Sequence, residues 1–408
     1  MDDALILFDD ANARDWFPFC LTRPAGELRF GTMTLRQRAE KRFGLRCAGY
    51  IAAPHLRTFD EPWAPPVLSD VPADSRATLF LSSRAAPDPD DTQLGPDEHL
   101  IAMDGVVCGW YVPAGSTPPD EAFLLDPTAH TPRLPVREVD GSLLEHPWQL
   151  ITDGVGRIAA DVAWLHPDAS RPRLPHGVHV LGDEAIVIGQ NVALEPGTVL
   201  DVSAGPVWLD DHVVVRAFSR LAGPVYVGPG SALLGGSFEA ASIGPVCRVR
   251  GEVAESTFLG YANKAHDGFL GHALVGMWVN LGAFTTNIDL KNNYGPVRMW
   301  TPGGTVNTGA MKLGALVGDH VKTAIGTLLN TGTVLGPGAS IFGGSPPKYV
   351  PPFAWGGQDP SSRHDIDRFL DTAATAMERR GVVLTDDGRA LLRAARDEAV
   401  RRSWMGDA

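Results

Sequence analysis

The 408-residue chain has few cysteines, and they do not form a motif. The four of them, Cys20, Cys47, Cys108 and Cys247, lie far apart and lack the short paired spacings of metal-binding and redox motifs. Nothing in this pattern calls for an oxidising compartment. We therefore expect a cytoplasmic protein.

The chain also lacks long apolar segments and an excess of positive charge. No apolar run approaches the roughly 18 residues that a membrane-spanning helix needs, and the start, Met1-Asp2-Asp3, has no basic region or cleavage site of a signal peptide. The formal net charge of −13 argues against a nucleic-acid partner or an anionic membrane surface, although it leaves room for a local basic pocket. A hydrophobic content of 44% describes a globular protein with two or three domains.

The second half of the chain contains a six-residue apolar period. The period is seen at Ile188, Leu194 and Leu200, at Leu209, Val215 and Leu221, and again at Val317, Thr323, Leu329, Leu335 and Ile341. A period of six fits neither an ordinary strand nor an amphipathic helix. It is typical of hexapeptide repeats, each of which forms a short strand and turn of a parallel β-helix. Each coil buries its apolar side chains only against neighbouring coils, so the domain needs stacking and end caps.

The first part of the chain predicts an α/β domain. Apolar runs at residues 4–8 and 77–81 are typical of buried parallel strands. Residues 34–43 predict a helix with its cap near Thr34. The Asp104-Gly105 pair favours a hairpin turn, and its alternative is a magnesium ligand.

These patterns predict four parts. They are an α/β domain at 1–145, a connector helix and linker at 146–178, a left-handed parallel β-helix at 179–350 and a helical tail at 351–408. The linker is rich in proline and arginine, and the tail contains two amphipathic patterns. Between residues 283 and 311 the six-residue period lapses, which predicts an inserted loop at one edge of the β-helix.

A polar cluster interrupts the repeats at Asn263-Lys264-Ala265-His266. The pattern His-x-x-aromatic-Leu-Gly, followed by Asn280-Leu281-Gly282-Ala283, resembles the acetyltransferase half of the bifunctional GlmU enzymes, which make UDP-N-acetylglucosamine. This resemblance implies a homotrimer, a general base at His266 and a sugar phosphate held by lysine and asparagine side chains. The residues expected to hold the acceptor are Lys264, Asn280, Asn287, Asn292, Asn293, Tyr294 and Arg298.

The expected chemistry suits a histidine. Acyl transfer from a thioester needs a base near neutral pKa to take a proton from the attacking amine or hydroxyl group. The alternative is that His266 is a structural turn residue and that Lys264 and Arg298 are solvated charges. We interpret His212, His272 and His320 as turn residues, and we predict no metal site because His212 has no second ligand at metal spacing.

The resemblance also suggests where the co-substrate lies. In such enzymes acyl-CoA occupies a groove between two adjacent prisms, against backbone and small residues. This nominates Ala310, Ala315 and Ala324 as contacts, with Lys322 and Lys348 as phosphate partners. We expect acetyl-CoA as the donor and a sugar phosphate or nucleotide sugar as the acceptor.

The segment Thr22-Arg23-Pro24 to Leu28-Arg29 resembles the start of a GlmU-like family of sugar nucleotidyltransferases, which implies a Rossmann-type domain. Arg23 and Arg29 could bind phosphate oxygens bidentately, and the alternative is that they pack on acidic neighbours at the surface. The family's glycine-rich loop should follow the first strand, yet residues 9–14 contain no glycine. No aspartate directly follows residues 77–81 to bind the Mg²⁺ that an active domain would need.

The leading hypothesis is therefore a transferase of the sugar-nucleotide pathway. It combines acyl transfer at His266 with nucleotidyl transfer at a divergent first domain. The alternative hypothesis is a non-catalytic protein that binds sugar nucleotides for regulation or assembly.

Overall fold

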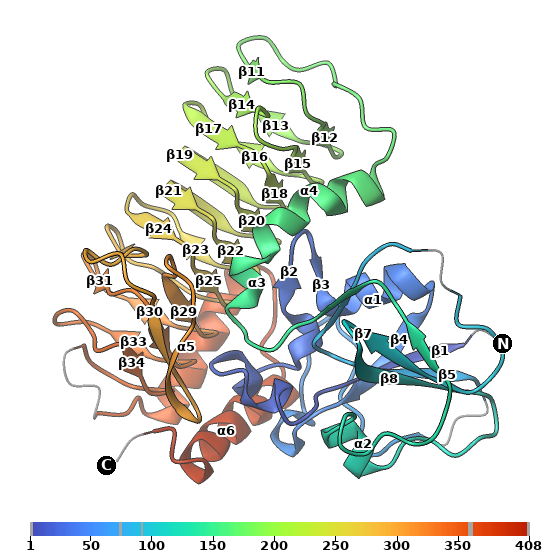
Figure 1. The fold of residues 1–408 in the computed structure, drawn as a ribbon. Helices are drawn as coiled ribbons and strands as arrows, with labels where there is room; N and C mark the ends of the chain where they lie inside the picture. Colours follow the sequence, from blue (N-terminus) through green and yellow to red (C-terminus); the bar gives the residue numbers. More distant parts are fainter. Residues whose placement is uncertain (1–2, 73–75, 91–92, 358–361, 406–408) are drawn as a thin grey trace. The chain divides into compact units, whose positions relative to one another are not determined.

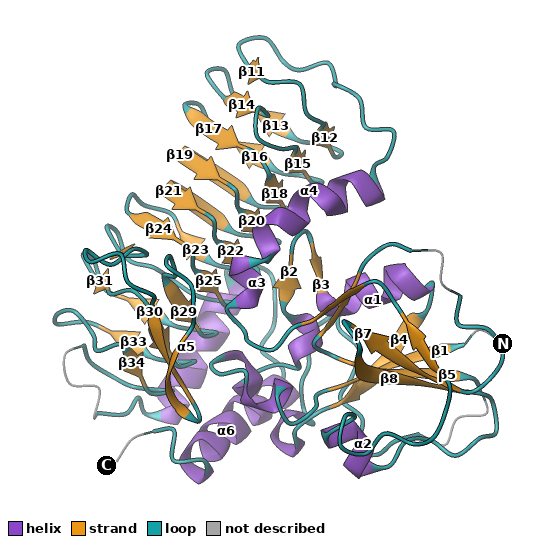
Figure 2. Ribbon diagram, in the orientation of Figure 1, coloured by secondary structure: helices purple, strands orange, loops and turns teal. Residues whose placement is uncertain are grey.

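The computed structural model describes residues 3–72, 76–90, 93–357 and 362–405. The chain divides into two compact units, which we describe separately. Unit 1 contains residues 1–147 and 385–398, and unit 2 contains residues 148–384 and 399–408. Figures 1 and 2 show a mixed α/β fold in unit 1 and a stack of short strands in unit 2. In the described ranges, no helix has both the length and the apolar character needed to cross a membrane.

Unit 1 is built on a six-stranded sheet in the order β4-β1-β5-β8-β7-β9. These strands are β1 (Ala4–Phe8), β4 (Arg46–Ile51), β5 (Thr78–Ser82), β7 (His99–Met103), β8 (Val106–Val112) and β9 (Val136–Glu138). Strand β1 pairs in parallel with β4 and β5, whereas β8 runs antiparallel to β5 and β7. The α/β fold predicted for the first domain is confirmed.

The local signals of unit 1 act as the sequence indicates. Helix α1 (Leu35–Phe43) begins with a capping box in which Thr34 and Gln37 satisfy each other's backbone N–H groups. Asp104 and Gly105 have φ values of 50° and 73° and form the turn between β7 and β8. The remaining elements are β2 (Arg29–Phe30), β3 (Met33–Thr34), β6 (Ala85–Pro87), β10 (Gly141–Leu143) and α2 (Glu121–Leu125).

Unit 2 is a parallel β-helix, as predicted, and its strand pairings define three faces. The first face contains β11 (His179–Leu181), β14 (Val199–Asp201), β17 (Ser219–Ala222), β24 (Phe269–Gly271), β26 (Thr286–Asn287) and β31 (Leu328–Leu329). The second face contains β13 (Ala193–Leu194), β16 (Val214–Val215), β23 (Asn263–Lys264), β30 (Lys322–Thr323) and β33 (Ser340–Ile341). The long strands β19 (Ala232–Glu239) and β21 (Arg248–Ala254) pair with strands of both faces.

The third face is the most regular. It contains β12 (Ile186–Ile188), β15 (Val207–Leu209), β18 (Val225–Val227), β20 (Ser242–Ile243), β22 (Thr257–Phe258), β25 (Leu274–Val275), β29 (Ala315–Val317), β32 (Thr333–Leu335) and β34 (Tyr349–Val350). The repeated apolar side chains of all three faces meet inside the prism, where Leu200, Val215 and Leu335 are fully buried. This shared core is why the six-residue period predicts the fold.

An insertion and three helices complete unit 2. The insertion, residues 288–314, carries an antiparallel hairpin of β27 (Arg298–Thr301) and β28 (Gly304–Asn307). Helices α3 (Gln149–Thr152) and α4 (Gly154–Leu165) precede the first coil. Helix α5 (Ile366–Glu378) packs Phe369 against Phe353 and His320, with ring centroids 5.1 and 5.9 Å away. Helix α6 (Asp386–Arg401) contributes residues to both units.

Candidate functional site

The second face presents a column of polar side chains on consecutive coils. Arg248 pairs with Asn263, Asn263 with Asn280, and Asn280 with Lys322. Parallel pairing places equivalent side chains on the same side of a sheet, and we call these four residues the outer column. Asn263 Nδ2 donates to Asn280 Oδ1 at 2.7 Å. The structure therefore brings together two predicted residues, Asn280 and Lys322.

Lys264, the residue after Asn263, points to the opposite side and is buried. It takes the place in register that Val249 occupies on the preceding coil, and it is 2% exposed. Its Nζ donates to the carbonyl oxygens of Arg250, His266 and Gly268 at 2.8, 3.2 and 2.7 Å. Burial lowers its pKa to about 8. Its three N–H groups are thus occupied by the main chain, so we assign Lys264 to fixing this corner in place of the expected phosphate contact.

His266 lies exposed on the corner that Lys264 holds, residues 265–268. The corner is tied to its neighbours, because Arg250 Nε donates to Asp267 Oδ1 at 3.1 Å and Phe284 N donates to the Asp267 carbonyl at 2.8 Å. The imidazole is open to solvent, which a base acting on a bound substrate requires. Arg250 was not among the residues predicted from the sequence.

Asn287 is a structural residue of the β-helix. It is 1% exposed, and its side-chain amide accepts from Gly271 N and donates to Gly271 O, both at 2.8 Å. These bonds extend the β ladder from one coil to the next and leave Asn287 buried under the first face. The other predicted acceptor residues, all exposed and all on the insertion, are Asn292, Asn293, Tyr294 and Arg298.

The residues suggested as acyl-CoA contacts do not form one group. Ala315 is buried in β29 on the third face, and Ala310 lies on the insertion, where its carbonyl accepts from Val297 N at 2.8 Å. Ala324 follows β30 and lies close to Lys322 in the chain. The pKa of Lys348 is lowered by burial and by the charges of Lys291 and Arg298, so this lysine belongs to a separate basic cluster.

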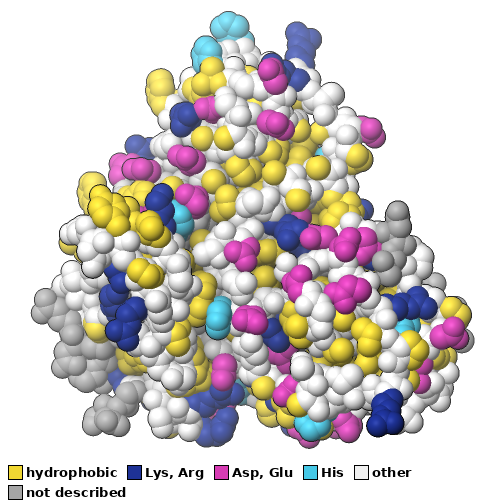
Figure 3. All heavy atoms as spheres, viewed as in Figure 1, with side chains coloured by type: hydrophobic (Ala, Val, Ile, Leu, Met, Phe, Trp, Pro, Cys, Tyr) yellow, Lys and Arg dark blue, Asp and Glu magenta, His cyan; other side chains and the backbone are white. Residues whose placement is uncertain are grey.

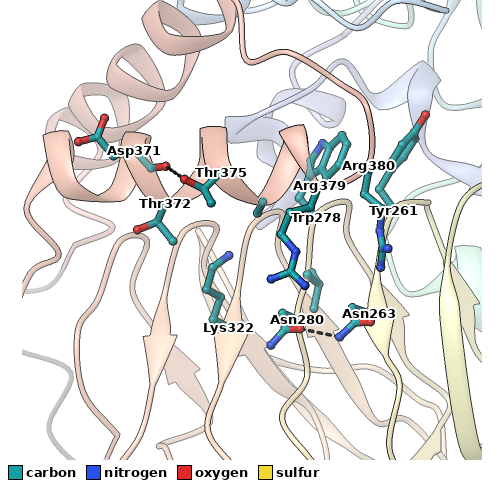
Figure 4. Close-up of a pocket in the computed structure, with 12 residues that line it drawn as sticks. Tyr261, Asn263, Trp278, Asn280, Lys322, Asp371, Thr372, Thr375, Arg379 and Arg380 are labelled. Atoms are coloured by element: carbon teal, nitrogen blue, oxygen red, sulfur yellow. Dashed lines mark hydrogen bonds between the residues drawn. The ribbon is translucent and has the colours of Figure 1, made fainter.

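A pocket of about 550 Å³ lies between the second face and α5 (Figure 4). The β-helix contributes Tyr261, Asn263, Trp278, Asn280 and Lys322. The helix and the residues that follow it contribute Asp371, Thr372, Thr375, Arg379 and Arg380. We call this the α5 pocket. Figure 4 shows the side chains of Arg379 and Arg380 directed toward the Asn263–Asn280 pair, with Lys322 rising from the same face. The amphipathic pattern at residues 366–379 predicts a helix but does not predict that α5 covers this face.

The other singled-out histidines fit the turn interpretation. His212, His272 and His320 have φ values of 59°, 46° and 60°, which are the left-handed values of coil corners. The imidazole of His272 also contacts Asp289 at 2.8 Å and Glu255 at 3.1 Å. Across the described residues, no group of three or more His, Cys, Asp or Glu side chains is arranged to hold a metal ion.

In unit 1, a buried ion pair lies at the carboxyl ends of two adjacent parallel strands. Phe8 of β1 is in register with Ser82 of β5, and Asp10 and Arg84 lie just beyond these residues. Arg84 Nε and Nη2 donate to the Asp10 carboxylate at 2.9 and 2.8 Å, and Ser82 Oγ donates to it at 3.0 Å. The pair lies where a glycine-rich phosphate loop was expected, and sequence reasoning did not identify it.

Arg23 and Arg29 are buried, being 2% and 6% exposed. Arg23 donates to both carboxylate oxygens of Glu61, at 2.8 and 3.3 Å, and Arg29 Nη1 donates to the carbonyl of Thr32. The surface position considered as an alternative is therefore wrong, although Arg23 does pack on an acidic neighbour. These contacts favour a structural role, and phosphate binding by either arginine stays a prediction.

Asp9 provides a test of the electrostatics at this strand edge. Burial raises its pKa from 3.8 to about 7, so between these pH values the folded chain holds a proton that the unfolded chain releases. Stability should consequently fall as pH rises from 4 to 8, with Asp9 contributing about 4 kcal/mol. Asp9→Asn should lack this contribution. Urea denaturation of both proteins across that range measures the difference, and parallel pH curves would contradict the burial of a protonated Asp9.

Comparison with known proteins supports the resemblance. Residues 5–170 match the family described as sugar nucleotidyl transferase. A bifunctional sugar-1-phosphate nucleotidylyltransferase/acetyltransferase of Sulfurisphaera tokodaii is 31% identical over 94 residues, which cover 23% of each chain. The bifunctional protein GlmU of Synechococcus elongatus is 31% identical over 183 residues, 40% of this chain and 36% of the relative. The crystal structure of an Arabidopsis UDP-N-acetylglucosamine acyltransferase aligns with 55% of this chain and 96% of its own, at 12% identity and a TM-score of 0.22.

These findings confirm the GlmU-like resemblance and show that residues 5–170 are similar to sugar nucleotidyl transferases. The matched regions span only 23% and 36% of the curated relatives' own length. The activities and substrates of those relatives are therefore properties of the relatives alone. For this chain, the comparison shows a similarity to transferases.

Proposed function

We propose that this chain is a transferase of the sugar-nucleotide pathway whose β-helix moves an acyl group from acyl-CoA to an amino-sugar phosphate. One observation carries the proposal. An exposed imidazole, His266, stands on a corner fixed from beneath by the buried ammonium of Lys264, and the Asn280 amide belongs to the adjoining face. The similarity to GlmU supports acetyl-CoA as the donor.

In the proposed step, the amine nitrogen of the acceptor bonds to the thioester carbonyl carbon while His266 takes a proton from that amine. The adduct then breaks its carbon–sulfur bond, and the departing thiolate of CoA receives the proton from the imidazolium. The products are an amide and the free thiol, so the step needs no oxidant or reductant. Asn280 Oδ1 accepts from Asn263, which leaves the N–H donors of Asn280 for the oxyanion or the substrate.

We also propose that the chain acts as a homotrimer. Coil corners expose large apolar side chains: Phe218 is 85% exposed, Phe284 62% and Ile325 78%. Figure 3 shows apolar side chains among charged ones on the visible face of the β-helix. Phe284 N bonds to Asp267 and Gly326 N bonds to Ala283, so two of these corners stack beside that of His266. A second prism covering them would lie next to the imidazole.

Thiol release tests the acyl transfer. The full chain is incubated with acetyl-CoA and, in turn, each of a panel of amino-sugar 1-phosphates, 6-phosphates and nucleotide-linked amino sugars. We expect acceptor-dependent release of CoA thiol with at least one of them. The four cysteines are buried and reduced, so the protein should add little background to a thiol reagent. Silence across the panel from folded protein would argue against acyl transfer.

One observation favours a non-catalytic first domain. The ion pair of Asp10 and Arg84 fills the strand edge where a triphosphate would need backbone N–H donors and a glycine turn. We therefore propose that unit 1 does not transfer nucleotides and that its similarity to sugar nucleotidyl transferases reflects common ancestry or retained binding. Release of pyrophosphate from a nucleoside triphosphate and a sugar 1-phosphate with Mg²⁺ would contradict this proposal.

A further inference from the structure

The lining of the α5 pocket has more positively charged than negatively charged side chains. Lys322, Arg379 and Arg380 line it, and the carboxylate of Asp371 is the single acidic group of the lining. In the described part of the chain, no carboxylate forms an ion pair with any of these three cations. This arrangement stands out in a protein with a formal net charge of −13. A cluster of like charges without counter-charges is what an anion-binding site requires.

Two further positive charges act on Arg380. The pKa of Lys322 is lowered by burial, and that of Arg380 is lowered by burial and by the charges of Arg248 and Arg379. Arg248 belongs to the outer column, next to Asn263. An anion held between α5 and this column would relieve the repulsion and would accept charge-assisted hydrogen bonds from both sides.

The shape of the pocket fits a ligand longer than a phosphate ion. Asp371 and Arg379 lie eight positions apart along and just beyond α5, which at about 1.5 Å per residue separates them by about 12 Å. Tyr261 and Trp278, whose ring centroids are 4.3 Å apart, form an aromatic wall. Thr372 and Asp371, near the middle of α5, supply a hydroxyl and a carboxylate, which are groups that bind hydroxyls.

We propose that the α5 pocket binds a nucleoside diphosphate group, with its phosphates on Lys322, Arg379 and Arg380 and its base against Tyr261 and Trp278. Two ligands carry this chemistry. In a nucleotide sugar the diphosphate continues into a hydroxylated ring, and in CoA it continues into the pantetheine arm. The lining includes Asn280, which the proposed acyl transfer also uses, but it does not include His266. Nucleotide binding can therefore be measured separately from acyl transfer.

Isothermal titration calorimetry of the full chain tests the site. The probes are UDP, UDP-glucose, ADP, CoA and inorganic pyrophosphate, each titrated at low and moderate salt. We expect at least one nucleotide to bind more tightly than pyrophosphate and its affinity to fall as salt increases. Tighter binding of UDP-glucose than of CoA assigns the site to a nucleotide sugar, and the reverse order assigns it to CoA. No nucleotide binding, or affinity for pyrophosphate equal to that for the nucleotides, overturns the proposal.

Substitutions locate the binding. Lys322→Met and Arg379→Gln each remove one charge and should weaken the tightest nucleotide about ten- to a hundredfold. Arg368→Gln is the matched control, because Arg368 is an exposed arginine on the same helix outside the pocket lining. It should change affinity less than twofold. Arg379 is itself exposed, so loss of binding in Arg379→Gln cannot be ascribed to unfolding, and unchanged binding in both pocket variants would place the ligand elsewhere and overturn the proposal.

Discussion

Replacing His266 with alanine should lower the rate of acyl transfer about a hundred- to ten-thousandfold. The reason is the loss of a positioned base in the step that forms the amide bond, since general base catalysis contributes a factor of that size. The imidazole is exposed, so its removal should leave the core intact. The rate is measured as acceptor-dependent thiol release under saturating acetyl-CoA, with the acceptor concentration varied so that kcat and KM are resolved separately.

The expected signature is a fall in kcat with little change in KM, because a base acts in the transition state and not in binding. His179→Ala is the matched control, since His179 is also an exposed histidine of the β-helix, on β11 far along the chain from the site. It should retain the parent rate. Equal thiol release by His266→Ala and the parent would remove His266 from the mechanism. Nucleotide binding at the α5 pocket should be unchanged in either variant.

The architecture of unit 2 follows from the sequence because burial repeats in it. Each coil places an equivalent apolar side chain in the same core. The repeated apolar positions, such as Leu200, Val215 and Leu335, therefore predict the β-helix from the sequence alone. The α/β fold of unit 1 can also be predicted from the sequence, because β1 and β5 are short apolar runs of the kind that parallel sheets bury on both faces.

The candidate site was harder to predict, because residue type does not reveal on which side of a strand a residue lies. Lys264 and Asn287 are polar and stand in a motif that resembles a catalytic one, yet both point inward and satisfy main-chain groups. Asn263 and Lys264 are neighbours in sequence with opposite orientations. Without the register of β21 and β23, the sequence could not show which of the two faces outward and which is buried.

Two parts of the site depend on contacts between distant segments. The outer column joins Asn280 to Lys322 across the whole insertion, which interrupts the six-residue count. The amphipathic pattern of residues 366–379 predicts a helix but not the face on which it packs, so the α5 pocket could not be foreseen. A signal for the Asp10 and Arg84 pair did exist, because polar residues that follow two adjacent parallel strands meet at one edge of the sheet.

That pair leads to the second large effect. Replacing Arg84 with methionine should lower the free energy of unfolding by about 3–5 kcal/mol, the usual cost of removing one partner from a buried ion pair. The Asp10 side chain is 4% exposed, so its carboxylate would remain buried without a cation, and the carbonyl of Leu144 would lose its donor as well. Urea denaturation followed by tryptophan fluorescence measures the loss.

Two further variants separate the charge from the packing. Arg46→Met removes an exposed arginine of the same unit and should change stability by no more than about 0.5 kcal/mol. Adding Asp10→Asn to Arg84→Met should recover part of the loss, because no uncompensated charge then stays buried. A loss below about 1 kcal/mol in Arg84→Met would show that solvent or another group neutralises Asp10, and the strand edge would then be open enough to reconsider a phosphate there. Because Arg84 belongs to unit 1, acyl transfer by the folded fraction of Arg84→Met should equal that of the parent, which distinguishes a structural ion pair from a catalytic one.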